Sequence, residues 1–382
     1  MRTRRIVSVC IALLLVVAIV WGIVAGIIKL VNTTRTKIQE HKEYAASLEA
    51  KLDKMSLEEK VAQMILAYQP EEDPVVTQKK YQFGGYVFFA KYFKNNTPEQ
   101  VVADMAAYQD RSKIPMLLAV DEEGGTINRI SKYRQYRDEP FASPQEVYYG
   151  AKFDGIIADT KEKAAFLKIL GLNTNLAPVA DVPYDKKNYM YNRAFSTNAE
   201  EVADYVEYVT NEYKEADVVS CLKHYPGFGN NGNSHLTVIE DTRELQVFNE
   251  RDSIPFQAGI AAGTPMIMIT HNIVDAYDSK NPATLSKSVH AALRDELGFE
   301  GVIVTDGLEM SGVTKFEPNA AKVAVKAVQA GNDLLCTGTP IEHYEAILEA
   351  VHQGKISEER INESVMRILE LKKAYGLLDQ GK

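Results

Sequence analysis

Short apolar segments alternate with segments of helical periodicity from about residue 60 to the end of the chain. The apolar segments have four to six residues without polar alternation, which is typical of parallel strands buried on both faces. Eight of them lie near Ile65, near Phe88, up to Val120, near Leu176, up to Leu222, up to Thr270, up to Thr305 and up to Cys336. Most of the intervening stretches are long enough for a crossover helix. Eight such units in about 320 residues predict a (β/α)8 TIM-type barrel, an α/β fold.

The main competing fold is a doubly wound open sheet, which usually carries a glycine-rich phosphate loop after its first strand. No such loop follows the apolar segment near Ile65. At the other end of the chain, apolar residues recur at helical spacing between residues 357 and 378. This spacing predicts an amphipathic helix that closes the domain.

The N-terminal segment from Ile6 to Ile28 is apolar and uncharged, and as a helix it is long enough to cross a hydrocarbon core of about 30 Å. Three arginines precede it, so the positive-inside rule places the N-terminus in the cytoplasm and the rest outside the cell. We therefore expect residues 1–31 to form a cytoplasmic tip and a transmembrane signal-anchor helix, residues 32–54 a helical stalk, and residues 55–382 one catalytic domain. The alternative is secretion after cleavage of a signal peptide.

The charge and cysteine content exclude several classes of protein. The 382 residues include 43 Lys and Arg against 52 Asp and Glu, a formal net charge of -9. This balance provides no basic field for a phosphate backbone, so we expect no nucleic-acid partner. The three cysteines, Cys10, Cys221 and Cys336, are too few and too scattered for a disulfide framework or a thiolate metal site.

Polar residues follow most of the predicted strands at their carboxyl ends, where the active site of a barrel lies. They are Asp121, Asp181, Lys223, His224, His271 and Asp306. Taken singly, each has an ordinary explanation, because an aspartate at a strand end is often a helix cap and a lone histidine is often structural. Their convergence on one mouth of the barrel predicts an active site.

The loop at residues 223–235, with the sequence KHYPGFGNNGNSH, gives the strongest local signal. Its glycines and histidines indicate a mobile loop that closes over a ligand and brings in a proton-transferring group. His235, at its far end, can exchange a proton near neutral pH. A flexible polar loop without chemistry is the alternative. The spacing of His224, His235 and His271 matches no metal-ligand motif, and we expect neither a metal nor another cofactor.

Six motifs occur in order along the chain. They are MSLEEKVAQM (55–64), VDEEGG (120–125), LAPVADV (176–182), NRAFS (192–196), KHYPG (223–227) and VTDGLEM (304–310). Together they resemble glycoside hydrolase family 3, and specifically its single-domain bacterial β-N-acetylglucosaminidase branch. The resemblance extends from about Lys54 to Leu378. Other branches append a second α/β domain that supplies the acid/base carboxylate, and we expect this chain to have none.

The resemblance implies a retaining exo-glycosidase that removes terminal β-linked N-acetylglucosamine, with a cell-wall glycan or muropeptide as its carbohydrate partner. Asp306 would be the nucleophile and His235 the general acid and then the base. The hydroxyl groups of the terminal sugar would be bound by Asp121, Arg193, Lys223 and His224. His271 would line the pocket.

Three positions depart from the family pattern. Asn233 stands where an aspartate usually orients the acid/base histidine, and an amide cannot stabilise the imidazolium electrostatically. Thr126 replaces an arginine, and Phe228 replaces a histidine. These changes leave open a β-glucosidase, a β-glycoside phosphorylase and a catalytically weak sugar-binding wall protein. A histidine acid/base is compatible with phosphorolysis, because it does not repel an incoming phosphate as a carboxylate would.

Overall fold

The computed structural model divides the chain into two compact units, residues 1–54 and residues 55–382. The residues described are Trp21, Gly26, 29–36, Gln39, 42–234 and 236–379. In the first unit, residues 42–53 are helical. The segment predicted to span the membrane lies outside the described residues, apart from Trp21 and Gly26. In the part of the chain that is described, no helix is both long and apolar enough to cross a membrane.

The second unit contains an eight-stranded parallel sheet in the order β11-β9-β7-β6-β3-β2-β1-β12. Its strands are β1 (Ile65–Tyr68), β2 (Gly85–Phe88), β3 (Leu117–Val120), β6 (Thr174–Asn175), β7 (Val219–Tyr225), β9 (Met266–Ile269), β11 (Val302–Thr305) and β12 (Leu335–Thr337). The first and last strands in this order are joined by a parallel bridge between Val304 and Leu334, which nearly closes the sheet into a barrel. The predicted (β/α)8 architecture is confirmed.

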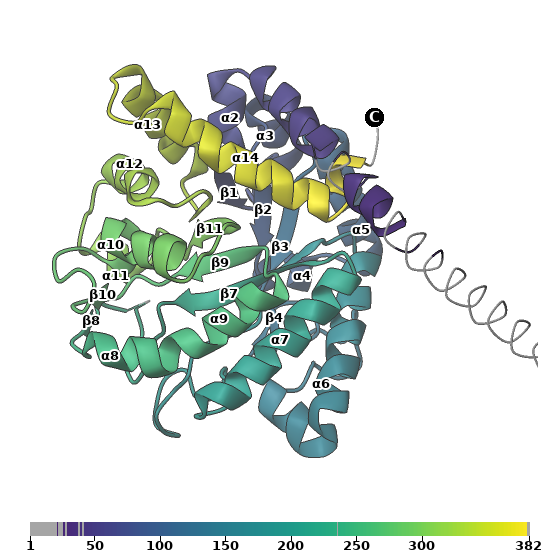
Figure 1. Ribbon diagram of the computed structural model, residues 1–382, viewed down its shortest axis with the longest axis vertical. Coiled ribbons are helices and arrows are strands. Elements are labelled where there is room, and N and C mark those ends of the chain that lie inside the picture. The colour runs from purple at the N-terminus through teal and green to yellow at the C-terminus, as the bar shows by residue number, and fades with distance from the viewer. Residues whose placement is uncertain are drawn as a thin grey trace, which may run out of the picture. The chain divides into compact units, whose positions relative to one another are not determined.

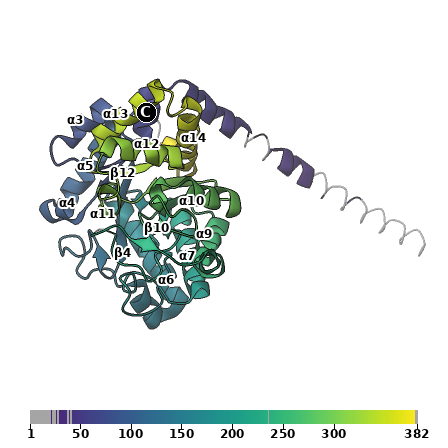
Figure 2. The same cartoon turned by 90° about the vertical axis from the view of Figure 1, so that its left-hand side faces the viewer.

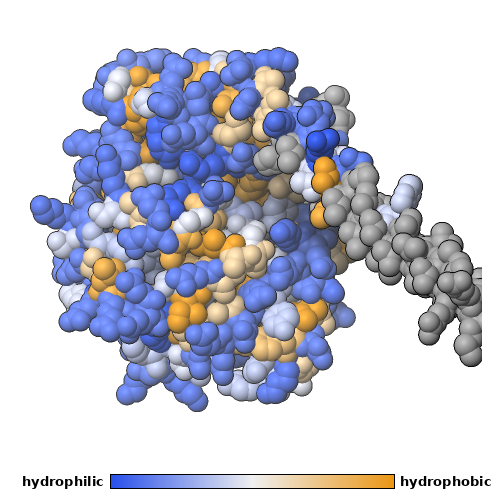
Figure 3. Space-filling view, viewed as in Figure 1, coloured by the Kyte–Doolittle hydropathy of each residue, from blue (hydrophilic) through white to orange (hydrophobic). Residues whose placement is uncertain are grey.

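The strands are buried on both faces, as the apolar segments predicted. All four residues of β2, β3, β9 and β11 are buried. Close packing also requires small residues, because a Cβ at Gly85 would overlap the backbone oxygen of Leu117 on the neighbouring strand. The hydrophobic effect thus stabilises the barrel interior. The surface seen in Figure 3 is mostly hydrophilic, with scattered apolar patches.

Helices surround the barrel, as Figure 1 and the turned view in Figure 2 show. Those before β7 are α2 (Leu57–Gln63), α3 (Pro74–Tyr81), α4 (Ala90–Asn95), α5 (Pro98–Asp110), α6 (Pro144–Ile169) and α7 (Ala199–Glu215). Those after β7 are α8 (Leu245–Val247), α9 (Ser253–Ala262), α10 (Lys287–Ala291), α11 (Ser311–Thr314), α12 (Ala320–Ala330), α13 (Pro340–His352) and α14 (Glu358–Ala374). Capping boxes start three of them, at Ser56, Thr97 and Ser143. The predicted C-terminal amphipathic helix is confirmed by α14, which buries Ile361 and Leu369.

Two small sheets lie outside the barrel. The hairpin β4 (Glu122–Gly124) and β5 (Ile127–Asn128) follows β3 directly, and the pair β8 (Glu240–Asp241) and β10 (Ile273–Val274) is parallel. The sequence pattern predicted neither, because strands of two or three residues are too short to show a periodicity.

One predicted strand end was wrong by three residues, and another strand is shorter than expected. The strand expected to end at Leu222 continues to Tyr225, because β7 and β9 keep pairing after a shift in register at Lys223. The strand near Leu176 has only two residues in ladder pairing and ends at Asn175. Pro178 follows it and has no N–H group to donate to a ladder. Asp181 nevertheless lies close to the barrel mouth, because Val179 forms an isolated parallel bridge with Lys223.

Candidate active site

The predicted site residues come from strands that are distant in sequence but neighbours in the barrel. Asp121 follows β3 and Asp306 follows β11, while Lys223 and His224 lie inside the last part of β7 rather than after it. Because parallel strands end at one edge, these side chains reach the same mouth of the barrel. Asp121 and Lys223, 102 positions apart in sequence, are in direct contact.

A buried cluster of alternating charges forms the floor of this mouth. The Lys223 ammonium lies 2.8 Å from Asp121 Oδ1 and 2.6 Å from Glu123 Oε1. Glu123 also accepts two hydrogen bonds from Arg193, with Nε at 3.0 Å and Nη2 at 2.7 Å. Such a two-pronged pair fixes the guanidinium plane as well as its charge. Arg193 and Lys223, expected to bind sugar, are therefore held by one carboxylate.

The charges in this cluster stabilise one another. Burial would raise the pKa of Glu123, but Arg193 and Lys223 outweigh it and hold that pKa well below its ordinary value. Burial would lower the pKa of Lys223, but Asp121 and Glu123 raise it above its usual range. Lys223 is therefore an ammonium at neutral pH. It can donate hydrogen bonds to hydroxyl oxygens, and it cannot serve as a general base.

Glu123 and Arg129 are residues of the site that sequence reasoning missed. Glu123 was named above only as part of the VDEEGG motif. The signal that could have identified it is that two buried cations, Lys223 and Arg193, require a counter-ion. Arg129 directly follows β5, and its Nη2 lies 3.5 Å from Asp121 Oδ2. The hairpin brings it back over Asp121, so only knowledge of that short hairpin could have identified it.

His224 is held in one orientation by Asp181. Its Nδ1 donates to Asp181 Oδ2 at 2.7 Å, and the same carboxylate accepts the backbone N–H groups of His224 at 3.2 Å and Phe228 at 2.7 Å. The Phe228 ring packs edge-on against the imidazole at 5.4 Å between centroids. Asp181 thus joins strand β7 to the start of the glycine-rich loop and fixes the histidine tautomer with a proton on Nδ1.

His271 is fully buried, and both of its ring nitrogens have partners. Nδ1 lies 2.7 Å from Thr284 Oγ1, and Nε2 lies 2.9 Å from the backbone oxygen of Gly307. Because a carbonyl oxygen only accepts, Nε2 carries a proton. Gly307 directly follows Asp306, so His271 fastens the segment that carries the predicted nucleophile.

The segment after Asp306 is packed closely against β1. Asp306 Oδ1 accepts the backbone N–H of Gly307 at 2.7 Å. A Cβ at Gly307 would overlap the hydroxyl of Tyr68, so a side chain at this position would displace Tyr68. Burial, together with the charges of Glu309 and Asp306, raises the pKa of Tyr68 far above its ordinary value, and its phenol is neutral. Tyr68 was not predicted, because the strand pattern treats it as one more core residue.

The far end of the glycine-rich loop is tied to the same segment. The backbone N–H of Gly312 donates to the carbonyl of Ser234 at 2.9 Å, and Lys315 Nζ donates to the carbonyl of Leu236 at 2.7 Å. His235 stands between these two residues and lies outside the described residues. Asn233 is half-buried, and its carbonyl accepts the N–H of Leu236 at 3.1 Å. The chain on either side of His235 is therefore anchored to the segment that begins with Asp306.

Within the described ranges, no group of three His, Cys, Asp or Glu side chains could hold a metal ion. His224 and His271, two of the three histidines weighed above as ligands, have Asp181, Thr284 and Gly307 as partners. The arrangement is a polar, charge-compensated mouth in which the carboxylates of Asp121 and Glu123 hold the cations of Lys223 and Arg193.

Comparison with known proteins identifies the family. Residues 56–371 match the N-terminal domain of glycosyl hydrolase family 3. The chain belongs to this family, and by family it is a glycoside hydrolase. The match covers the barrel and every site residue described above, which confirms the resemblance drawn from the six motifs.

Individual relatives support the hexosaminidase branch. The chain is 31% identical to the β-hexosaminidase A of Pseudoalteromonas piscicida over 328 residues, which cover 77% of this chain and 54% of that protein. It is 32% identical to a β-hexosaminidase of Methylococcus capsulatus, covering 72% of this chain and 81% of that protein. The family 3 β-N-acetylglucosaminidase structure from Paenibacillus sp. superimposes with a TM-score of 0.79 at 29% identity, covering 86% of this chain and 64% of the other.

Proposed function

We propose that the protein is a retaining exo-β-N-acetylhexosaminidase that hydrolyses terminal β-linked N-acetylglucosamine. The observation that supports the proposal is that Asp306, directly after β11, and Asp121, directly after β3, lie at the same carboxyl edge of the barrel, where Asp121 belongs to the charge cluster with Glu123, Lys223 and Arg193. Asp306 attacks the anomeric carbon and the leaving oxygen departs, which gives a glycosyl-enzyme intermediate that water hydrolyses. The β-hexosaminidase relatives support the choice of sugar.

The cluster suits recognition of one terminal sugar. The ammonium of Lys223 and the guanidinium of Arg193 donate hydrogen bonds to ring hydroxyls, and the carboxylate of Asp121 accepts them. His224, held by Asp181 through Nδ1, offers its other ring nitrogen to a hydroxyl group. His271 does not bind the sugar in this proposal, because both of its ring nitrogens already have partners. It acts by holding the segment that carries Asp306.

His235 acts as the acid/base in this proposal. It protonates the leaving oxygen in the first step, and as a base it then takes a proton from the attacking water. The anchoring of Ser234 and Leu236 to the segment after Asp306 supports this assignment, because it brings the histidine's chain neighbours to the nucleophile. A histidine, which is cationic as the acid and neutral as the base, also avoids the repulsion that a second carboxylate would have with Asp306.

The test uses initial rates on paired chromogenic β-N-acetylglucosaminide and β-glucoside substrates, with and without phosphate. We expect faster turnover of the N-acetyl sugar, no dependence on phosphate, and loss of turnover in Asp306→Ala. Preference for the glucoside would instead identify a β-glucosidase, and a rate that rises with phosphate would identify a phosphorylase. The first outcome would contradict the proposed sugar, and the second would contradict hydrolysis.

A catalytically weak sugar-binding protein is the second candidate, and Asn233 favours it. An amide next to the acid/base cannot stabilise the imidazolium as a carboxylate does. If the folded protein binds N-acetylglucosamine but turns over neither substrate, and Asn233→Asp restores turnover, then the binding function is the correct one.

Two parts of the proposal depend on the sequence alone. Action on cell-wall glycan follows from the family branch, and anchoring at the cell surface follows from the apolar segment Ile6–Ile28. Fractionation of cells that express the full chain tests the anchor. We expect the protein in the membrane fraction and digestible by protease added outside the cell. Release into the medium as a shortened chain would instead support signal cleavage.

A further inference from the structure

The chain between residues 227 and 241, which contains most of the glycine-rich loop, is held at both ends. It begins just after β7 and ends with β8. At the far end, the backbone N–H groups of Ile273 and Asp275 donate to the carbonyls of Ile239 and Asp241 at 2.8 and 3.0 Å. A loop whose ends are joined has fewer conformations than one attached at a single end. The groups that join the ends therefore restrict where the residues between them lie.

The Arg243 side chain joins the two ends of this loop. Its Nη2 donates to the carbonyl oxygen of Gly227, at the start of the loop, at 3.0 Å. Its Nε and Nη2 donate to the carboxylate of Asp241, at the end of the loop, at 2.9 and 2.7 Å. Its Nη1 donates to Asp252, the residue before α9. The planar guanidinium binds these partners in different directions at once, which a single ammonium cannot do.

The guanidinium and the start of the loop fit closely. A Cβ at Gly229 would lie 2.3 Å from Arg243 Cζ, and a Cβ at Gly227 would lie 2.9 Å from the Asp252 carboxylate. Both glycines have positive φ, at +54° and +120°. The side chains of Asp241 and Asp252 are buried, and that of Arg243 is 16% exposed. Breaking such a buried pair from one side is costly, so the base of the loop stays closed in the folded protein.

The same stretch of the loop is held from the side of the mouth by Asp181. Phe228 stands between the two glycines, and its N–H donates to Asp181 Oδ1 at 2.7 Å. Its ring packs against His224. The start of the loop is therefore fixed between the sugar-binding side of the barrel and the Arg243 guanidinium.

The middle of the loop meets the segment that follows Asp306. The carbonyls of Ser234 and Leu236, the neighbours of His235, accept hydrogen bonds from the backbone of Gly312 and the side chain of Lys315. These neighbours thus depend on two attachments, one at the base of the loop and one at this segment. Loosening the base should shift them relative to the nucleophile.

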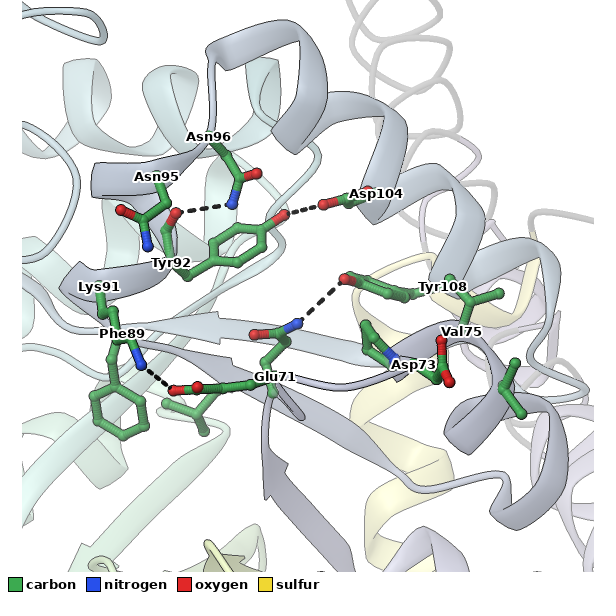
Figure 4. Close-up of a pocket in the computed structure, with 14 residues that line it drawn as sticks. Glu71, Asp73, Val75, Phe89, Lys91, Tyr92, Asn95, Asn96, Asp104 and Tyr108 are labelled. Atoms are coloured by element: carbon green, nitrogen blue, oxygen red, sulfur yellow. Dashed lines mark hydrogen bonds and ion pairs between the residues drawn. The ribbon is translucent and has the colours of Figure 1, made fainter.

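The carboxylates on the β1–β2 side of the mouth are separated from the reacting bond. In Figure 4, Glu71 and Asp104 line a cavity of about 620 Å³. The packed rings of Phe89 and Tyr68, at 4.7 Å between centroids, stand between this cavity and the segment that carries the proposed nucleophile. These carboxylates therefore cannot replace a misplaced acid/base.

We propose that Arg243 is a positioning residue for the reaction: by closing the base of the loop at residues 227–241, it sets where His235 stands relative to Asp306. The inference rests on the proposed function, which gives His235 the acid/base role. Arg243 acts through the loop and not on the sugar. A displacement of a catalytic group by about 1 Å can cost about 100-fold in rate, so a loosened base should be visible in catalysis.

Leaving groups of different basicity report the acid/base separately from the nucleophile. Phenyl β-N-acetylglucosaminide releases a basic phenolate that needs a proton as it leaves, whereas the 2,4-dinitrophenyl glycoside releases a weakly basic one that leaves without it. In full-length Arg243→Lys, we expect kcat/KM for the phenyl substrate to fall about 10- to 100-fold. We expect kcat/KM for the dinitrophenyl substrate to change by less than about threefold, because the lysine keeps the charge and loses only the planar fork.

Arg294→Lys is the matched control. Its side chain is 18% exposed, pairs with the buried Asp333 at 2.6 Å, and donates to the carbonyl of Gly301 at 2.7 Å. Gly301 directly precedes β11, so this ion pair lies at the amino edge of the barrel, away from the mouth. We expect Arg294→Lys to lower Tm, as Arg243→Lys does, but to leave the ratio of the two kcat/KM values at that of the wild type.

Gly229→Ala disturbs the same contact from the side of the loop and keeps the arginine, so it decides the question if Arg243→Lys does not fold. We expect the same selective loss for the phenyl substrate. Unchanged rates or equal losses on both substrates in these variants, or a selective loss in Arg294→Lys, would overturn the positioning role.

His235→Ala distinguishes this inference from the proposed function. It should lose turnover of the phenyl substrate selectively, and at least as strongly as Arg243→Lys. If it loses both substrates equally, or if the wild type turns over neither, the proposed acid/base or the proposed hydrolase fails, and the role of Arg243 fails with it. A selective loss in His235→Ala without one in Arg243→Lys and Gly229→Ala would overturn the role of Arg243 alone.

Discussion

Replacing Glu123 with glutamine tests whether one buried carboxylate holds the cations of Lys223 and Arg193 in place. The change keeps the shape of the side chain but leaves Lys223 and Arg193 without the charge that lies 2.6 and 2.7 Å from them. Removing one partner of a buried ion pair costs about 4 kcal/mol of unfolding free energy. For a domain of this size that corresponds to a decrease of about 6 °C in Tm.

The pH dependence of Glu123→Gln makes the test specific. Because the pKa of Glu123 is lowered in the folded protein, its carboxylate stabilises the fold above the pKa of the unfolded chain, and this contribution is lost as the pH falls. The difference in stability between wild type and Glu123→Gln should therefore shrink by up to about 1.4 kcal/mol per pH unit below about pH 4. Thermal unfolding followed by circular dichroism between pH 3 and pH 7 measures it.

Glu122→Gln is the control, because the neighbouring carboxylate is also buried but accepts only from backbone N–H groups and Ser131. Burial raises the pKa of Glu122, so the folded state takes up its proton first and the wild type gains stability as the pH falls through that range. The difference between wild type and Glu122→Gln should therefore grow at low pH. If Glu123→Gln unfolds like the wild type at pH 7, or if both variants respond to pH in the same direction, Glu123 is not the ionised counter-ion.

The remaining predictions concern the segment after the proposed nucleophile, Asp306, and the proposed acid/base, His235. Gly307→Ala should lower kcat/KM and cost about 1 to 3 kcal/mol of stability, because the new methyl group displaces the Tyr68 hydroxyl. Adding Tyr68→Phe to this variant should recover part of the lost kcat/KM and part of the lost stability. Additive losses in the double variant, in both kinetics and melting, would refute the contact between Gly307 and Tyr68. Asn233→Asp should move the basic limb of the pH–rate profile up by about one unit, because a carboxylate stabilises the protonated form of His235; an unchanged limb would show that this position does not act on the acid/base.

The pattern of the sequence was sufficient to predict the barrel and the mouth at which its chemistry gathers. Apolar segments without alternation identify strands buried on both faces whatever their partners are, because the apolar pattern belongs to each strand alone. Residues that follow such strands must then meet at one edge, which is where the structure places Asp121 and Asp306, whereas Lys223 lies within β7. The six motifs indicated the family, which an apolar pattern alone cannot identify.

The pairing of side chains was decided by the tertiary structure. Glu123 holds two cations from distant segments, and Tyr68 meets Gly307 only because β1 and the segment after β11 are brought together where the barrel closes. His271 was expected in the pocket, but the fold occupies both of its nitrogens. Such contacts depend on strand register and on short hairpins, which leave no periodic signal in the sequence. The sequence therefore determined which elements form, and the closed barrel determined which charges meet.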